Sequence, residues 1–243
     1  VPLLYPEIDR LMDIIIQEGV KIVFTSAGSP KKWTPLLKSH GITVVHVISS
    51  ALFAKKCEEA GVDAVVAEGF EAGGHNGREE TTTLTLIPNV VESCSLPVIA
   101  AGGISSGKSV VAAMTLGAEG VQIGTRFALT DESSASPVFK EYCLSLGEGD
   151  TKLLLKKLAP TRLVRNNFRD AVEKAEDSGA SAEELRTLLG RGRAKKGIFE
   201  GDLEEGELEI GQVSAIVSRQ QSVAEVMNEL VEAMQRAAEK KYV

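Results

Sequence analysis

The sequence has few cysteines, few aromatic residues and no long apolar run. Its three cysteines, Cys57, Cys94 and Cys143, are widely spaced and form no Cys-x-x-Cys pair, so we expect neither a disulfide framework nor a metal site, and a reducing, cytoplasmic location. No segment is apolar over the length that a membrane span needs, and no signal peptide is recognisable. The net charge of -7 argues against nucleic-acid and membrane partners.

An initiator methionine is also absent, because the chain begins Val1-Pro2-Leu3-Leu4. We therefore expect the first part of a longer chain to be missing. What is present, 43% hydrophobic and 25% charged residues over 243 positions, is ordinary for one globular domain or slightly more.

Short apolar runs alternate with stretches of helical spacing along the first half of the chain. The expected strands are residues 20–25, 42–47, 64–68, 97–101 and 120–123, and the expected helices include 7–17, 50–60, 84–93 and 105–116. Such continuous apolar runs are typical of parallel strands buried on both faces. The pattern predicts an α/β fold, either a doubly wound sheet or a TIM (β/α)8 barrel. The doubly wound fold is the poorer alternative, since no Gly-x-Gly-x-x-Gly motif follows a first strand.

The second half of the chain differs in composition. Residues 144–205 are rich in Leu, Lys, Arg and Glu at helical spacing, without a convincing strand, and predict a helical insertion or lid. A last helix is expected over 223–240. The predicted organisation is therefore 1–142 as the barrel part, 143–206 as the insertion, and 207–243 as a segment that returns to the barrel.

Glycine-rich stretches follow three successive expected strands. They are Gly73-Gly74-His75, Gly102-Gly103 and Gly124-Thr125-Arg126. Glycine lets backbone N–H groups converge on an anion, and Arg126 adds a fixed charge. Barrels often bind phosphate with the loops after strands 7 and 8. If the last two stretches are those loops, the barrel lacks its first two or three strands, and residues 1–4 are at most the end of the third.

Three motifs in this order carry a resemblance to a known family. They are residues 68–77 (Glu-Gly-Phe-Glu-Ala-Gly-Gly-His-Asn-Gly), 100–104 (Ala-Ala-Gly-Gly-Ile) and 121–127 (Val-Gln-Ile-Gly-Thr-Arg-Phe). The chain resembles the FMN-dependent nitronate monooxygenase superfamily, which includes the flavin-dependent enoyl-acyl-carrier-protein reductases of the FabK type. Its departures are the absence of the family's early Gly-Gly-Met motif and early Asn, both of which contact the flavin.

The resemblance implies a flavin site at the carboxyl face of the barrel. The FMN phosphate would be held by Gly102, Gly103, Gly124 and Thr125. The ribityl chain and ring would lie near Ala27, Gly28, Glu68, Gly74 and Gln122. His75 would be the catalytic residue beside the reactive edge of the flavin, where an imidazole can move a proton.

The resemblance leaves the reaction open. The favoured hypothesis is reduction of an enoyl thioester on acyl carrier protein, with NAD(P)H as co-substrate. Residues 67–69, 81–86 and 201–212 look more similar to the reductase branch of the superfamily. The alternative is a nitronate monooxygenase that uses O₂, and a second alternative is a truncated, non-catalytic barrel. A homodimer is one possible assembly.

Other polar residues receive plainer interpretations. His46 is expected to be a hydrogen-bonded core histidine and His40 a solvated residue at a helix end. The basic cluster of Arg191, Arg193, Lys195 and Lys196 is either a solvated loop or a surface for the acidic carrier protein.

Overall fold

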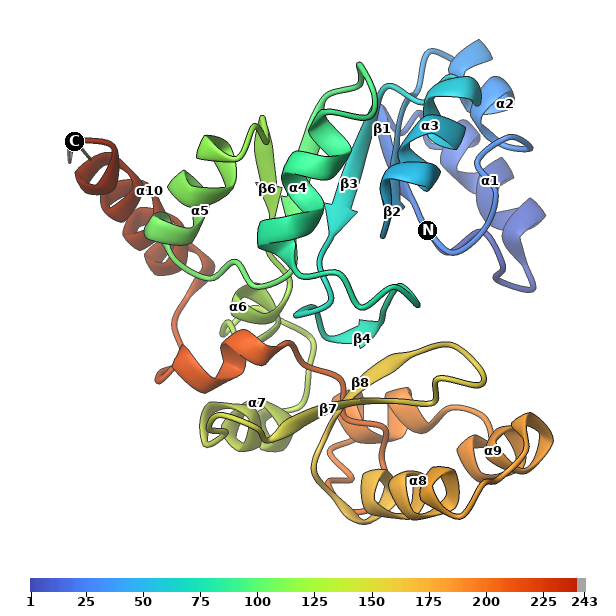
Figure 1. Cartoon of the computed structure of the whole chain (residues 1–243), viewed down its shortest axis with the longest axis vertical. Coiled ribbons are helices and arrows are strands. Elements are labelled where there is room, and N and C mark those ends of the chain that lie inside the picture. The colour runs from blue at the N-terminus through green and yellow to red at the C-terminus, as the bar shows by residue number, and fades with distance from the viewer. Residues whose placement is uncertain (240–243) are drawn as a thin grey trace.

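A parallel sheet of five strands forms the first half of the molecule. The computed structural model describes residues 1–239, and the strand order is β1 (Ile22–Thr25), β2 (Thr43–Ile48), β3 (Ala64–Glu68), β5 (Val98–Ala101) and β6 (Gly120–Gln122). The spatial order follows the chain order without a reversal. Right-handed crossovers therefore place every connecting helix on the same face, as in a barrel, whereas a doubly wound sheet has a switch point. The sheet is a curled half-barrel (Figure 1).

The helix before the first strand and the helices that follow β1, β2, β3 and β5 cover the outer face of the sheet. They are α1 (Ile8–Gln17), α2 (Thr34–Ser39), α3 (Ala51–Glu59), α4 (Thr83–Val91) and α5 (Gly107–Thr115). The main apolar core lies between this helical layer and the sheet, where Met12, Leu37, Val65 and Ile87 are fully buried. The elements predicted for residues 7–123 are thus confirmed, and α4 tolerates Pro88 within its span.

The inner face of the sheet carries a smaller apolar cluster. Val45, Val66 and Ala101 form it, while Ile22 and Phe24 at the β1 edge are exposed. Beside this edge, Pro2 makes an isolated parallel bridge to Ser26. Residues 1–3 therefore run along the end of β1, the position that the sequence assigned to the end of a preceding strand.

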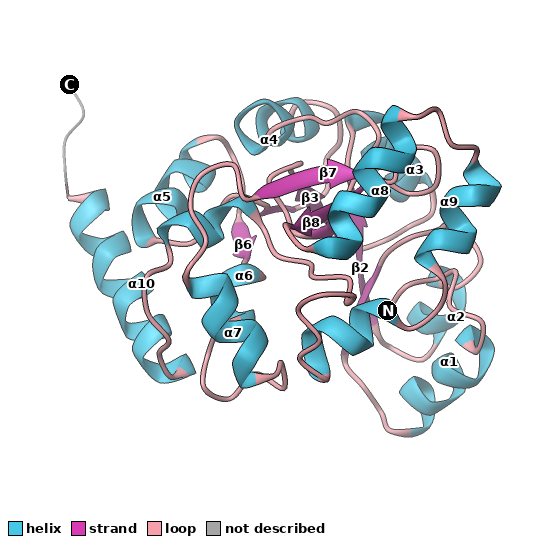
Figure 2. Cartoon of the chain, turned by 90° about the horizontal axis from the view of Figure 1, so that it is seen from below, coloured by secondary structure: helices cyan, strands magenta, loops and turns pink. Residues whose placement is uncertain are grey.

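A second, antiparallel sheet corrects the expectation that residues 144–205 contain no strand. Its order is β4 (Gly74–His75), β8 (Thr161–Val164) and β7 (Thr151–Leu154). The sequence did not predict these strands because Lys152 interrupts the apolar run of β7 and Arg162 interrupts that of β8. Figures 1 and 2 show this sheet beyond the carboxyl ends of the parallel strands, so the inserted segment covers that end of the half-barrel.

The remaining elements of the second half are short. α6 (Thr125–Ala128) and α7 (Pro137–Leu144) precede β7, and α8 (Asn167–Asp177), α9 (Ala182–Leu189) and a π-helix (Lys195–Phe199) follow β8, before a 3-10 helix (Gln212–Ile216). α7 crosses the predicted boundary between residues 142 and 143, and Cys143 packs with Phe139 in one buried cluster. The insertion therefore shares its core with the flanking chain.

The last helix, α10 (Val223–Ala238), packs against α5. The contact is close because a Cβ on Gly107 would lie 2.2 Å from the backbone nitrogen of Met234. The predicted helix end at Lys240 lies outside the described residues. No helix in the part of the chain that the structure describes is both long and apolar enough to cross a membrane.

Candidate flavin site

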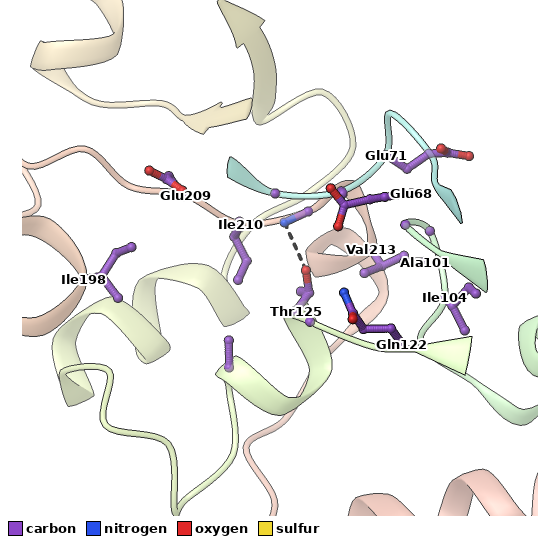
Figure 3. A pocket seen from close by; sticks show the side chains of 17 residues that line it. Glu68, Glu71, Ala101, Ile104, Gln122, Thr125, Ile198, Glu209, Ile210 and Val213 are labelled. Atoms are coloured by element: carbon purple, nitrogen blue, oxygen red, sulfur yellow. Dashed lines mark hydrogen bonds between the residues drawn. The ribbon is translucent and has the colours of Figure 1, made fainter. Parts of the chain in front are cut away.

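A pocket of about 220 Å³ opens at the carboxyl ends of the parallel strands. Glu68, Ala101 and Gln122, the last residues of β3, β5 and β6, point into it (Figure 3). The opposite wall comes from the π-helix and from residues 209–213. The pocket thus forms where three parallel strands end and a distant segment returns to them.

Two consecutive glycines line the pocket after β5. Gly102 and Gly103 have φ values of +83° and +68°, which disfavour a side chain at both positions. A Cβ on Gly102 would also lie 2.5 Å from the carbonyl oxygen of Gly69. Within the described residues no hydrogen bond uses the backbone N–H groups of Gly102, Gly103 or Gly124. These donors are therefore free for an anion.

Thr125 connects the loop after β6 to the far end of the chain. Its Oγ1 accepts a hydrogen bond of 3.0 Å from the backbone N–H of Gly211 (Figure 3). The hydroxyl hydrogen remains available as a donor. Gly211 cannot carry a side chain here, because its Cβ would lie 2.7 Å from the same oxygen.

The pocket also holds two half-buried carboxyl groups. Burial raises the pKa of Glu68 to about 7 and that of Glu209 to about 7. Neighbouring Glu207 also has a pKa of about 7, chiefly because it is buried and secondly because it lies beside Glu209. Both pocket acids are thus able to carry a proton near neutral pH. No lysine or arginine stands among the described residues that line the pocket.

Glu71 also lines the pocket beside Gly103, where a Cβ would lie 3.4 Å from Glu71 Oε1, and its carboxylate is held by Thr83. Its carboxylate accepts hydrogen bonds from the backbone N–H of Thr83 at 3.0 and 3.1 Å and from the Thr83 hydroxyl at 3.0 Å. Thr83 begins α4, so the acid stabilises a helix N-terminus. The Thr83 hydroxyl also lies 2.9 Å from the carbonyl oxygen of Gly102, so its one hydrogen is shared between the Gly-rich loop after β3 and that after β5.

His75 does not line this pocket. It is exposed on β4, opposite Thr161 of β8. Gly73 is the member of the Gly-Gly-His stretch that reaches the pocket, where a Cβ would lie 2.5 Å from the carbonyl carbon of Ile210. Gly74 is buried against the carboxyl group of Glu209. The catalytic role of His75 therefore stays a prediction.

Ala27 and Gly28 lie apart from the other predicted residues, in the turn after β1. Both have positive φ, at +51° and +149°, and neither lines the pocket. A Cβ on Gly28 would meet Leu3 at 3.0 Å. The structure thus brings together Glu68, Gly102, Gly103, Gln122, Gly124 and Thr125, and leaves Ala27, Gly28, Gly74 and His75 outside the pocket lining.

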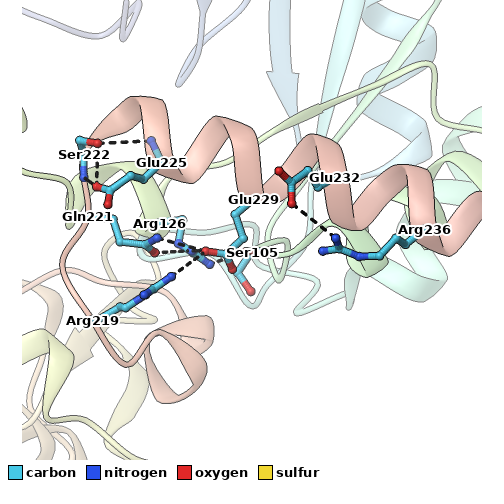
Figure 4. A network of polar contacts seen from close by, with 9 residues as sticks. All are labelled: Ser105, Arg126, Arg219, Gln221, Ser222, Glu225, Glu229, Glu232 and Arg236. Atoms are coloured by element: carbon cyan, nitrogen blue, oxygen red, sulfur yellow. Dashed lines mark hydrogen bonds and ion pairs between the residues drawn. The ribbon is translucent and has the colours of Figure 1, made fainter.

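The expectation that Arg126 binds an anion is wrong. Its guanidinium donates to the carbonyl of Ser105 at 3.1 Å, to Gln221 Oε1 at 2.6 Å and to Glu229 Oε2 at 2.8 Å (Figure 4). The last two partners belong to the segment that leads into α10 and to α10 itself. Arg126 therefore fastens the C-terminal helix to the sheet, and it does not line the pocket.

The far wall of the pocket was missed at the sequence level. Ile198, Glu209, Ile210 and Val213 line it, although the first belongs to the inserted segment and the others to the predicted returning segment. The Gly211-Gln212 pair was the available signal, since a glycine in the returning segment indicates a close approach of that segment to another part of the chain. Nothing in the local pattern distinguishes Ile198 from a core residue.

The other polar candidates behave as structural residues. His46 is buried, its Nδ1 lies 2.7 Å from Thr25 Oγ1, and burial lowers its pKa to about 4, so the core interpretation is confirmed. In the basic cluster, Lys195 and Lys196 pair with Glu200 and Asp202, and Arg193 stacks on Phe168.

The half-barrel, whose consecutive strands end in glycine-rich loops, places the fold in the class of α/β barrels, which often bind phosphate with such loops. The comparisons narrow this class. The profile of the nitronate monooxygenase family matches residues 6–233, and the chain belongs to that family. A probable nitronate monooxygenase from Bacillus subtilis is 34% identical over 228 residues, which are 90% of this chain and 65% of that protein.

Solved structures show the same similarity. The structure of FabK from Thermotoga maritima superposes with a TM-score of 0.90 at 37% identity and covers 98% of this chain and 76% of its own. The nitroalkane oxidase from Streptomyces ansochromogenes gives a TM-score of 0.77 at 26% identity, with 95% and 68% covered. The chain spans 46% to 65% of the length of the first curated relatives that it matches.

Proposed function

We propose that the protein takes part in the FMN-dependent reduction of an enoyl thioester by NAD(P)H, with the thioester carried by acyl carrier protein. The observation that carries the proposal is the glycine cradle, Gly102-Gly103 and Gly124-Thr125, at adjacent strand ends in a chain that is 37% identical to FabK. The proposal is that the chain supplies the phosphate side of a flavin site and the chemistry beside it.

The residues present fit FMN on its phosphate side. Free N–H groups and the Thr125 hydroxyl offer neutral donors to a phosphate, and the positive φ angles keep side chains out of the cradle. The pocket, at about 220 Å³, is smaller than the ~300–1,000 Å³ of complete ligand sites, so it corresponds to part of a flavin site. When bound, FMN supplies hydride transfer.

The chain's own residues would exclude water, hydrogen-bond to the cofactor and supply a proton. Ile198, Ile210 and Val213 would exclude water from the pocket, which strengthens the polar contacts inside it. Gln122 and the protonated form of Glu68 would donate hydrogen bonds to the bound cofactor. His75 would supply the proton that the α-carbon of the substrate gains.

We further propose that the parallel strands are the last five of a TIM barrel. The sequential strand order, the bridge from Pro2 to Ser26 and the 76% coverage of the FabK chain support this assignment. On this proposal, strands outside the present chain would complete the flavin site near Ala27 and Gly28.

Oxidation of nitronates by O₂ is the second candidate. Its support lies in the names of curated relatives, which include probable nitronate monooxygenases, and in the similarity to nitroalkane oxidase. A half-buried acid with a pKa near 7, such as Glu68 or Glu209, would serve either reaction, so the acids do not distinguish the two.

Anaerobic stopped-flow absorbance separates these functions. The purified protein is reconstituted with FMN and mixed either with NAD(P)H or with a nitronate. We expect NAD(P)H to bleach the flavin bands and a short enoyl thioester to restore them. Bleaching by the nitronate alone would reject the reductase in favour of the monooxygenase, and a protein that takes up no FMN would reject both.

A further inference from the structure

Arg162 of β8 is almost completely buried, with 2% of its surface exposed. Its Nε lies 3.2 Å from the carbonyl oxygens of both Phe70 and Ala72, and its Nη2 lies 2.6 Å from that of Phe70. The guanidinium also stacks on the Phe70 ring, 4.7 Å from its centre. These partners belong to the Gly-rich loop after β3, 90 residues earlier in the chain.

The hydrogen-bond partners of the buried Arg162 guanidinium are mainly backbone carbonyl groups. A buried guanidinium is costly unless a carboxylate or several polar groups compensate it. Within the described residues Arg162 makes no ion pair, and its hydrogen bonds go to the two loop carbonyls and to Thr151 Oγ1 at 3.4 Å. Burial accordingly lowers its pKa from the usual value. The nearby charges of Glu71 and Glu80 partly oppose this lowering of the pKa, and the loop backbone supplies most of the hydrogen bonds to Arg162.

Other contacts also hold this loop: the Glu71 carboxylate accepts hydrogen bonds from Thr83, and the Glu71 carbonyl accepts one of 2.9 Å from the N–H of Gln212. The carbonyl oxygens of Phe70 and Ala72 are the loop acceptors that Arg162 holds. Asn76 Nδ2 donates to the carbonyls of Ala72 at 3.0 Å and Gly74 at 2.9 Å, so Ala72 is shared between Asn76 and Arg162. Glycines at 69, 73 and 74 leave the loop backbone with wide conformational freedom. Glu71, Ala72 and Gly73 of this loop line the pocket.

We propose that Arg162 is a positioning residue that holds residues 70–74 in the conformation that lines the pocket. A planar guanidinium reaches two carbonyl oxygens of one loop at once and fixes their spacing, which a lysine ammonium cannot do in the same plane. The β7–β8 hairpin then acts on the pocket through the backbone of this loop. It does so without placing Arg162 in the pocket itself.

Arg169 provides a matched control within the same segment. Its side chain is also nearly buried, at 11% exposed, but it pairs with Asp170 at 3.2 Å and Glu173 at 3.1 Å on its own helix α8. It does not contact the loop. An arginine that contributes only to the fold would behave like Arg169 on conservative replacement.

Amide hydrogen exchange on the flavin-free protein tests the proposal. R162K and R169K each retain a charge, and their exchange is compared at Ala72 and Asn76, whose N–H groups bond to Gly69 and Pro160. We expect exchange at both amides to rise at least about tenfold in R162K, because hydrogen bonds to a charged group are lost, and less than about twofold in R169K. Equal exchange in the two variants would overturn the proposal, as would unfolding of R162K as a whole.

A second measurement extends the inference to the cofactor, and this extension rests on the proposed function. FMN titration by fluorescence quenching should give a dissociation constant at least about tenfold weaker in R162K than in R169K. Free guanidinium added to R162A should restore part of the affinity. If the unaltered protein binds no FMN, the proposed function fails while the exchange result still stands. If it binds FMN and R162K binds equally well, the extension fails instead.

Discussion

The hydroxyl of Thr125 accepts a hydrogen bond of 3.0 Å from the backbone N–H of Gly211, 86 residues further along the chain. The bond closes the pocket by joining the loop after β6 to the returning segment. Replacing Thr125 with valine keeps the shape but leaves the Gly211 N–H without an acceptor. We expect T125V to lose about 1–3 kcal/mol of unfolding free energy in urea titrations. T125S should stay within about 0.5 kcal/mol of the unaltered protein, and an equal loss in both variants would contradict this account.

Gly102 and Gly124 should respond differently to the same substitution. At Gly102 an alanine would adopt φ of +83° and meet the carbonyl oxygen of Gly69 at 2.5 Å. We expect G102A to lose at least about 2 kcal/mol of unfolding free energy, since the backbone angle alone costs about 1–2 kcal/mol. Gly124 has φ of -91° and open space around its Cβ position, so G124A should change stability by less than about 1 kcal/mol.

The same pair distinguishes folding from binding. In G124A the added methyl group would stand beside a free N–H group of the cradle, so FMN affinity should fall while the thermal midpoint without FMN stays. Unchanged FMN affinity in G124A would remove this loop from the phosphate site.

Glu68 should make stability depend on pH near neutrality. Burial raises its pKa from about 4.5 to about 7, so the folded state favours the protonated form. The stabilisation is complete below pH 4.5 and is lost as the pH rises through 7. The neutral variant E68Q should therefore match the unaltered protein near pH 5 and exceed it by about 1–3 kcal/mol at pH 8. Exposed Glu148 is the control, because E148Q should show no such difference.

His75 should affect turnover without affecting cofactor binding. It is exposed on β4 and does not line the pocket, so H75Q should bind FMN as tightly as the unaltered protein. If it supplies the proton to the substrate, kcat for the enoyl thioester should fall by about 100-fold or more. His40, exposed at the end of α2, provides the control in H40Q. A loss of turnover below about twofold in H75Q would exclude the catalytic role.

The parallel sheet was predictable because its strands are short, continuous apolar runs between helices. Strands β7 and β8 were not predictable, because each contains a charged residue, Lys152 or Arg162, that interrupts its apolar run. Lys152 is exposed, and Arg162 is buried only because the loop carbonyls of Phe70 and Ala72 accept its hydrogen bonds. From the local sequence alone, Arg162 would be predicted to lie on the surface.

Some residues of the candidate site were likewise predictable from the local sequence, and others were not. Its glycines and Thr125 were identified because backbone geometry at a strand end has a local signature. The direction of Arg126 has none, since Glu229, 103 residues away, determines it. Likewise, Glu209 reaches the pocket only because the segment after the insertion returns to it. Contacts of this range depend on the whole fold.

The antiparallel pairing of β4 with β8 has a consequence for the order of folding. His75 pairs with Thr161, whereas neighbouring strands of the parallel sheet are joined by much shorter connections. Contacts that are local in the chain form at a lower entropic cost than distant ones. The half-barrel should therefore assemble first and the hairpin dock afterwards, so that the pocket is among the last features of the native state to form and the first to be lost when the chain begins to unfold.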